Sequence, residues 1–122
     1  MIHATVTIVS PPGQRRGFAQ ALRCVVGPTR AEPGCLFCHL FEDVEIPGSF
    51  TLVEDWVSPG DFERRLRSEA YRQLLLLMEL APEAPVIQFH SVSSTAGMDA
   101  ILAARSRAAD WQEHDQVFPR YE

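Results

Sequence analysis

Two short runs of strand-favouring residues, joined by a turn-rich link, constrain the fold of this chain more than any other feature. The runs cover residues 35–41 and 50–57, and the link at 42–49 contains acidic residues and a Pro-Gly pair. Aromatic and β-branched residues favour strands, whereas proline and glycine end them. The pattern predicts a β-hairpin that begins after a second Pro-Gly pair at 33–34.

One carboxylate lies in the apolar row of the second predicted strand. Side chains alternate along a strand, so Phe50, Leu52, Glu54 and Trp56 share one face. Burying a carboxylate between Leu52 and Trp56 is costly unless it has a charged partner or lines a wet pocket. Glu54 is therefore the first candidate functional residue, with a structural ion pair as the alternative. For Trp56, plain core packing is the alternative to forming a pocket wall.

Alternation and helical periodicity predict the remaining elements. We expect strands at 2–9 and 86–92 and amphipathic helices at 14–26 and 58–80. The first helix is expected to stop at Gly27 and Pro28, and the second to restart at Ser68. The resulting order β-α-β-β-α-β predicts a ferredoxin-like α+β fold, with an antiparallel four-stranded sheet and both helices on one face.

The first 95 residues are expected to form one ferredoxin-like domain, because a chain of 122 residues rarely splits into two. Residues 96–122 are expected to extend this domain without forming another. Met98, Ile101 and Leu102 have helical spacing and predict a C-terminal helix within 97–109. Beyond it, apolar residues among charges predict docking against a partner subunit, with disorder as the alternative. They are Trp111, Val117, Phe118 and Tyr121.

The charge balance argues against a nucleic-acid-binding surface. The formal net charge is −5 at pH 7, whereas nucleic-acid binding needs clustered basic residues on a basic domain. The densest basic group, Arg64, Arg65 and Arg67, has acidic neighbours and is interpreted as a solvated helix face. No apolar run approaches the ~18 residues of a membrane span. With an odd number of cysteines and no signal segment, a cytoplasmic location is expected.

The cysteines and histidines of the predicted strands do not match a metal site. Cys35 and Cys38 form C-x-x-C, but a second ligand pair at zinc spacing is missing, and the two are predicted on opposite strand faces. We interpret them as buried core residues. By parity, His3, His39 and His90 are placed on the sheet face away from the helices. They are interpreted as structural histidines, with a base or metal cluster as the alternative.

The sheet face opposite the helices is predicted to be too apolar to remain in water. Helices cover only one face of such a sheet. A second copy of the chain under two-fold symmetry is the simplest cover for the other face, so a homodimer is expected. Five apolar residues mark this face: Val9, Phe37, Phe41, Val53 and Val57.

Four segments resemble the antibiotic biosynthesis monooxygenase (ABM) family: EPGCL at 32–36, FTLVEDW at 50–56, LRSEAYRQLL at 66–75 and SVSSTAGMDAI at 91–101. The resemblance implies a dimeric α+β barrel. It also implies a monooxygenase that uses dioxygen on a small electron-rich aromatic, such as a quinol, phenol or polyketide-like anthrone, without a flavin or metal cofactor. Because one fold supports many activities, two alternatives stay open. One is a non-catalytic small-ligand binding or regulatory dimer, and the other is a different superfamily enzyme, such as an isomerase or haem degrader.

Under this resemblance, we expect a substrate pocket between the helices and the sheet. Glu54 would accept the substrate proton, and Trp56 would form a flat wall. Arg65 and Arg72 could pair with Glu54, hold a phenolate oxygen, or point to water. Many family members carry a histidine at the position of Arg65, so a histidine proton relay or haem ligand on this helix is not expected. Together with Arg65, the expected substrate-binding residues are Val6, Cys38, Leu52, Phe62, Leu66, Leu74 and Met78.

Overall fold

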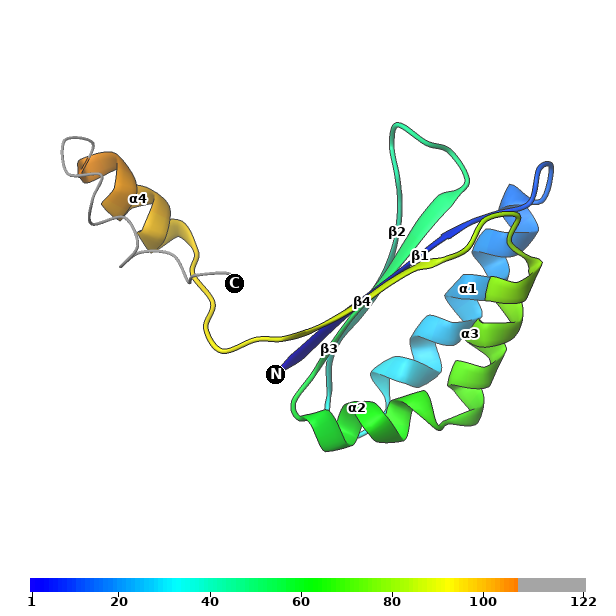
Figure 1. The fold of residues 1–122 in the computed structure, drawn as a ribbon, viewed down its shortest axis with the longest axis horizontal. Helices are drawn as coiled ribbons and strands as arrows, with labels where there is room; N and C mark the ends of the chain where they lie inside the picture. Colours follow the sequence, from blue (N-terminus) through cyan, green and yellow to red (C-terminus); the bar gives the residue numbers. More distant parts are fainter. Residues whose placement is uncertain (108–122) are drawn as a thin grey trace. The chain divides into compact units, whose positions relative to one another are not determined.

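A computed structural model describes residues 1–107 of the chain, which fall into two units. The second unit begins at Val92 and contains α4 (Met98–Ser106). The first, Met1–Ser91, confirms the predicted α+β order (Figure 1). Its elements are β1 (Ile2–Val9), α1 (Arg15–Arg30), β2 (Cys35–Glu42), β3 (Ser49–Trp56), α2 (Pro59–Leu66), α3 (Glu69–Leu80) and β4 (Val86–Ser91). The expected domain boundary at residue 95 stays a prediction.

The sheet of the first unit has four antiparallel strands in the order β2-β3-β1-β4. In the middle of the sheet, Val6 of β1 lies opposite Leu52 of β3 and Ile87 of β4. Figure 1 shows α1, α2 and α3 on the same side of this sheet. Within Met1–Ser91, the predicted one-sided arrangement of helices is therefore confirmed.

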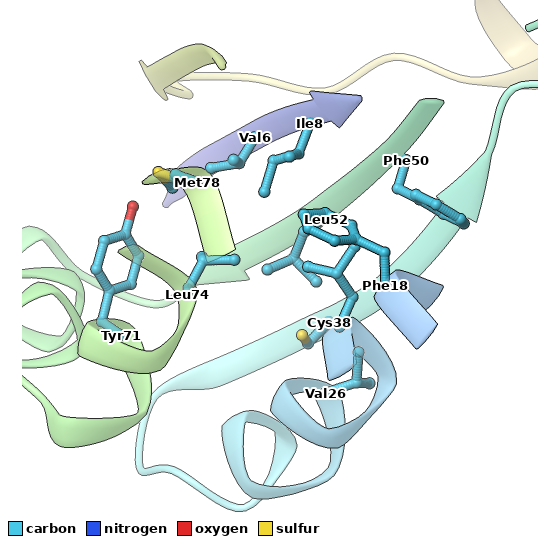
Figure 2. Packing of buried hydrophobic residues seen from close by; sticks show 11 residues of the cluster. Val6, Ile8, Phe18, Val26, Cys38, Phe50, Leu52, Tyr71, Leu74 and Met78 are labelled. Atoms are coloured by element: carbon cyan, nitrogen blue, oxygen red, sulfur yellow. The ribbon is translucent and has the colours of Figure 1, made fainter. Parts of the chain in front are cut away.

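The main core lies between the sheet and the helices α1 and α3. Alternate residues of β1 and β3 point into it, as predicted from the sequence, and apolar side chains of the helices meet them (Figure 2). We call this group the main core cluster. It contains Val6, Ile8, Phe18, Leu22, Val26, Cys38, Phe50, Leu52, Tyr71, Leu74 and Met78.

Two serine caps divide the second predicted helix into α2 and α3. Ser58 Oγ accepts a hydrogen bond from the backbone N–H of Asp61 at 3.2 Å, and Pro59 occupies the first helical position. Ser68 has an extended backbone, and its Oγ accepts from the N–H of Tyr71 at 3.1 Å. Such caps satisfy N–H groups that a helix start leaves without partners. The predicted restart at Ser68 is confirmed.

The predicted end of α1 at Gly27 and Pro28 is wrong, because the helix continues to Arg30. Thr29 is fully buried, and its Oγ1 donates to the carbonyl oxygen of Val25 at 2.6 Å. A proline near a helix end removes only one N–H donor from the last turn. The burial and hydrogen bond of Thr29 account for a last turn that continues past Pro28.

Within residues 1–107, no helix is long and apolar enough to cross a membrane. The helix predicted within 97–109 is present as α4. The residues predicted to dock against a partner, Trp111, Val117, Phe118 and Tyr121, lie outside the described residues.

The turn before β2 generates a prediction. Gly34 has a φ of +86°, and a Cβ there would collide with the Asp61 side chain. We expect Gly34→Ala to lower the free energy of unfolding by at least about 1–2 kcal/mol, the cost of a left-handed backbone for alanine. Gly17 in α1 is the control, since no atom lies within 4 Å of its added Cβ. Gly17→Ala should raise stability by about 0.5–1 kcal/mol. Urea unfolding measures both, and similar stabilities would contradict this account of the turn.

Candidate active site

Glu54 lies near the centre of the helix-facing side of the sheet. On β3 it is opposite Ala4 of β1 and Cys38 of β2. Both neighbours are small and buried, which leaves room for a longer side chain to reach the carboxylate from the helices. Glu54 is only 3% exposed. Its carboxylate must therefore find its partners inside the protein.

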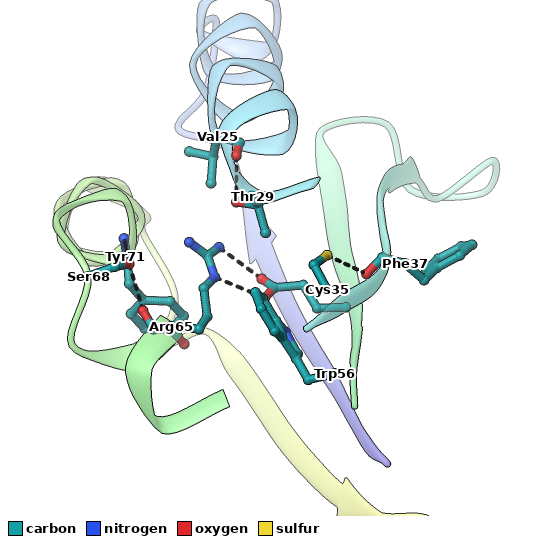
Figure 3. Close-up of polar contacts among 9 residues, drawn as sticks. Val25, Thr29, Cys35, Phe37, Trp56, Arg65, Ser68 and Tyr71 are labelled. Carbon is teal, nitrogen blue, oxygen red and sulfur yellow. Dashed lines mark hydrogen bonds and ion pairs between the residues drawn. The ribbon is translucent and has the colours of Figure 1, made fainter. Parts of the chain in front are cut away.

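Arg65 and Trp56 supply these partners. Arg65 of α2 donates from Nε to Glu54 Oε1 and from Nη2 to Oε2, both at 3.0 Å. Trp56 of β3 donates from its indole Nε1 to Oε1 at 2.9 Å. Figure 3 shows Arg65 extending from the helical side toward the strand that carries Trp56. We call these three residues the carboxylate centre.

The interpretation of Arg65 as part of a solvated helix face is wrong. Arg65 is 1% exposed, whereas Arg64 and Arg67 are exposed as predicted. Phe62 and Arg65 are three residues apart and share the inner face of α2. Burial alone would lower the pKa of Arg65, but the hydrogen bonds and negative charge of Glu54 outweigh burial and raise this pKa. Arg65 is therefore a permanent cation next to the carboxylate.

Tyr71 contacts the carboxylate centre, although its sequence position gave only a general apolar role. The guanidinium carbon of Arg65 lies 5.1 Å from the centroid of the Tyr71 ring, a cation–π distance. Burial, followed by the charge of Glu54, raises the pKa of Tyr71. The break between α2 and α3 hid this contact, because helical spacing does not continue across it. Arg72, the other predicted partner of Glu54, is exposed and pairs with Glu69 at 3.3 Å.

The structure brings the predicted apolar lining together as packed core. Trp56 and Phe62 form a second cluster with Ala4, and Leu66 packs against both this cluster and the main one. The rings of Trp56 and Phe62 are 6.5 Å apart. The roles of Trp56, Phe62 and Leu66 at a substrate site stay predictions. The other predicted lining residues belong to the main core cluster: Val6, Cys38, Leu52, Leu74 and Met78.

A cavity of about 290 Å³ adjoins the carboxylate centre. It lies between the turn before β2 and the helix α2, and two predicted site residues, Trp56 and Arg65, form part of its wall. Its other lining residues are Glu32, Pro33, Asp61, Arg64, Arg67 and Ser68. A larger, mostly apolar hollow of about 470 Å³ lies between α1 and α3, but none of the predicted site residues line it. The smaller cavity therefore reaches the carboxylate centre through Trp56 and Arg65, whereas Glu54 itself does not line it.

The prediction that Cys35 and Cys38 point to opposite faces is wrong. A β-bulge between Cys35 and Phe37 adds one residue to β2, so Cys35 lies opposite Trp56 and Cys38 opposite Glu54. Trp56 and Glu54 share the inner face, and both cysteines therefore face the helices. Burial, and then the charge of Glu54, raises the pKa of Cys38 to about 12. The buried thiol is protonated at neutral pH, which fits a core role.

The three strand histidines face away from the helices, as predicted. His3 Nδ1 lies 2.6 Å from Asp55 Oδ1, and the rings of His3 and His90 are 6.3 Å apart. His39 Nδ1 is 3.2 Å from a guanidinium nitrogen of Arg30. Among residues 1–107, no group of three His, Cys, Asp or Glu side chains is arranged to hold a metal ion. His3 and His39 thus each contact a polar side chain, as structural histidines do.

Loss of Arg65 tests the energetic role of the carboxylate centre. Arg65→Met leaves the Glu54 carboxylate buried without its cation, and we expect the free energy of unfolding to fall by about 3–5 kcal/mol. Adding Glu54→Gln removes the uncompensated charge and should recover much of this loss. As a control, Arg72→Met breaks the exposed contact with Glu69 and should cost less than about 1 kcal/mol. Urea unfolding compares the variants, and equal losses for the two arginines would contradict this role.

Comparisons with known proteins agree with this fold. The sequence model of the family described as ABM, antibiotic biosynthesis monooxygenase, matches residues 1–75. Among curated proteins, no sequence matches the chain. A solved antibiotic biosynthesis monooxygenase superposes with a TM-score of 0.69 at 22% identity, covering 77% of this chain and 100% of that chain.

Two further solved structures, each from a bacterium, superpose on this chain to a similar extent. The Deinococcus radiodurans structure gives a TM-score of 0.73 at 22% identity, with 80% of this chain and 98% of that chain covered. The Pseudomonas aeruginosa structure gives 0.68 at 26% identity, with 76% and 94% covered. The family match at residues 1–75 contains all three residues of the carboxylate centre. This chain therefore belongs to the antibiotic biosynthesis monooxygenase family.

Proposed function

We propose that this protein is a cofactor-independent monooxygenase that oxidises a small electron-rich aromatic with dioxygen. With a quinol as substrate, one oxygen atom of O₂ is added to the ring and the other leaves as water, so that the product is a hydroxyquinone. The quinol supplies all the electrons that O₂ accepts, and no external reductant is needed. Loss of a proton from a quinol hydroxyl starts the reaction, because the phenolate gives up an electron more readily than the neutral ring.

The observation that carries this proposal is the buried carboxylate centre in a chain of this family. The two oxygens of Glu54 accept three hydrogen bonds from Trp56 and Arg65, whereas a carboxylate offers about four acceptor positions. We assign the remaining position, on Oε2, to the substrate hydroxyl. Arg65 holds a positive charge close to where the phenolate would form. The apolar side chains around the centre would keep water away from the reacting ring.

A non-catalytic ligand-binding role is the second candidate. It is favoured by the bidentate contact with Arg65, which engages both oxygens of Glu54 as a purely structural ion pair would. In that case the protein binds a small ligand without consuming oxygen. The two functions differ in one direct measurement, the uptake of dioxygen in the presence of a quinol or phenol.

Oxygen uptake by Glu54→Gln tests the proton-accepting role. Glutamine keeps the shape of the side chain but removes the basic oxygen, so turnover should fall by on the order of 100-fold while substrate affinity changes little. Trp56→Phe keeps a flat ring and removes the indole N–H donor, and it should have a smaller effect on turnover. Exposed Glu69 gives the matched control, and Glu69→Gln should leave turnover unchanged.

Thermal melting of the same variants separates chemistry from stability. If Glu54→Gln melts at a lower temperature but consumes oxygen at the wild-type rate per folded molecule, Glu54 is a structural residue and the base assignment fails. A wild-type protein that consumes no oxygen with any quinol, phenol or anthrone tested would favour the binding role.

We also propose that the protein acts as a homodimer in the cytoplasm. The support for dimerisation is the sheet face opposite the helices, where Phe37, Phe41 and Val57 are between one third and slightly over one half exposed. Phe37 and Phe41 flank His39, whose ring centroid lies 4.4 Å from that of Phe37. An apolar surface with this much aromatic area favours burial against another sheet.

A charge on this face tests the dimer. Wild-type protein is expected to sediment at twice the chain mass of 13.7 kDa. Val53→Asp places a carboxylate on the open face and should give monomer or aggregate, because an unpaired charge is costly in an apolar interface. Val44, which is 96% exposed in the hairpin loop, is the matched control, and Val44→Asp should stay dimeric. A monodisperse wild-type monomer at micromolar concentration would contradict the proposal.

A further inference from the structure

A hollow of about 430 Å³ lies between the second half of α1 and β2, the outer strand of the sheet. Side chains of α1 form one wall and those of β2 form the other. None of its residues belongs to the carboxylate centre, so this hollow is separate from the candidate active site. We call it the edge hollow, and it is lined by Arg23, Val26, Gly27, Arg30, His39 and Leu40.

Arginine supplies the charge of the edge hollow. Its wall contains Arg23 and Arg30, both exposed, and no Asp or Glu. Among residues 1–107, neither arginine forms an ion pair with a carboxylate. The whole chain has a net charge of −5 at pH 7, so these two cations do not reflect a generally basic surface. An anion that enters the edge hollow is attracted by both arginines and meets no carboxylate in the wall.

The guanidinium group of Arg30 is held in place by the edge of β2. Its Nε donates to the carbonyl oxygen of Cys38 at 2.8 Å, and its Nη2 lies 3.2 Å from His39 Nδ1. Because arginine can only donate hydrogen bonds, His39 Nδ1 is the acceptor and the ring proton lies on Nε2. These contacts use two of the five N–H donors of a guanidinium group, which leaves three for other acceptors. A donor group that is already fixed loses less conformational freedom when it binds an anion.

The composition of the edge hollow matches a phosphate monoester better than other small anions. A phosphate monoester carries about −1.5 to −2 charges at pH 7, which suits two guanidinium groups, whereas a carboxylate carries a single charge. The planar donors of arginine also match phosphate oxygens in pairs. Buried Val26 and partly buried Leu40 give the ester group an apolar wall. The C-terminal end of a helix repels anions, and the charge of Arg30 in the last turn of α1 offsets this effect.

We propose that the edge hollow binds a small phosphate monoester, with the phosphate between Arg23 and Arg30. The two arginines are seven residues apart, so they lie on the same side of α1 and about 10 Å apart along its axis. Both side chains are long enough to reach one phosphate from that separation. The inference goes beyond the oxygenase proposal, because it uses no residue of the carboxylate centre and needs no turnover.

Calorimetric titration of the full-length protein in a phosphate-free buffer tests the proposal. Phenyl phosphate is the probe, and benzoate is an aromatic anion with a single charge. We expect phenyl phosphate to bind at least about tenfold more tightly than benzoate, and added salt to weaken its binding. Inorganic phosphate lacks the ester group and should bind more weakly than phenyl phosphate. The proposal is overturned if inorganic phosphate or benzoate binds as tightly, or if phenyl phosphate does not bind at about 10 mM.

Two glycines of α1 give a matched pair of variants that locates the site. Gly27 lines the edge hollow and Gly17 does not, and an added Cβ at either position meets no atom within 4 Å. Gly27→Glu places a carboxylate next to the arginines, so the affinity for phenyl phosphate should fall at least about tenfold. Gly17→Glu adds the same charge to the same helix and should leave the affinity unchanged. Equal losses in the two variants would mean non-specific attraction and would overturn the proposal.

Removal of each arginine tests its contact with the phosphate. Arg23→Gln and Arg30→Gln should each lower the affinity for phenyl phosphate about tenfold. Exposed Arg67 on the opposite side of the Ser68 cap is the control, and Arg67→Gln removes an equal charge without changing the affinity. Unchanged affinity in Arg23→Gln would overturn the proposal. Should Arg30→Gln fail to fold by circular dichroism, Arg23→Gln and the glycine pair still decide the outcome.

The two proposals for this protein fail independently. Binding of phenyl phosphate without oxygen uptake on any aromatic would reject the oxygenase and keep the phosphate site. Oxygen uptake on quinols with no binding of phenyl phosphate would do the reverse. Glu54→Gln should lower oxygen uptake and leave the affinity for phenyl phosphate unchanged, because Glu54 does not line the edge hollow.

Discussion

The contact between Glu54 and Arg65 joins the centre of the sheet to α2 through two parallel hydrogen bonds inside the core. Neither charge could be buried here without the other, because an unpaired buried ion costs several kcal/mol. The pair therefore fixes the rotation of α2, so that Phe62 packs next to Trp56 and the exposed arginines turn outward. The caps at Ser58 and Ser68 set the length of α2 so that Arg65 stands opposite the carboxylate.

The same pair gives the interior a polar centre between two apolar clusters. On one side lies the main core cluster, and on the other Ala4, Trp56 and Phe62. Burial, and to a smaller extent the negative charge of Glu54, raises the pKa values of the neighbouring Cys38 and Tyr71. Both groups are thus held neutral, and charge in this region is confined to the ion pair. Small-molecule sites generally have few polar groups in mostly apolar surroundings, and the surroundings of Glu54 share this composition.

Much of the fold follows from local pattern. Strand alternation placed Glu54 and Trp56 on one buried face, and the serine, proline and acidic residues at 58–61 marked the start of α2. The predictions that were wrong concern features set by tertiary contacts, which local sequence does not show. The sequence alone predicts that Arg65 is solvated like its neighbours, because it shows the charge but not the partner across the core, which lies eleven residues earlier on β3. The end of α1 was missed because burial of Thr29 outweighs the local signal of Gly27 and Pro28.

The bulge in β2 has a consequence for comparing this chain with its relatives. One extra residue, Leu36, is accommodated between Cys35 and Phe37 without disturbing the pairing of the strand beyond it. A relative with a regular strand here would be one residue shorter, and the match would require a gap at this point. If the two chains were instead aligned without the gap, every residue before Leu36 would be equated with a neighbour on the wrong side of the strand. Insertions and deletions at this position are therefore expected to be tolerated during divergence. The same change between Cys38 and Glu42 would move every side chain in the rest of the strand to the opposite face of the sheet.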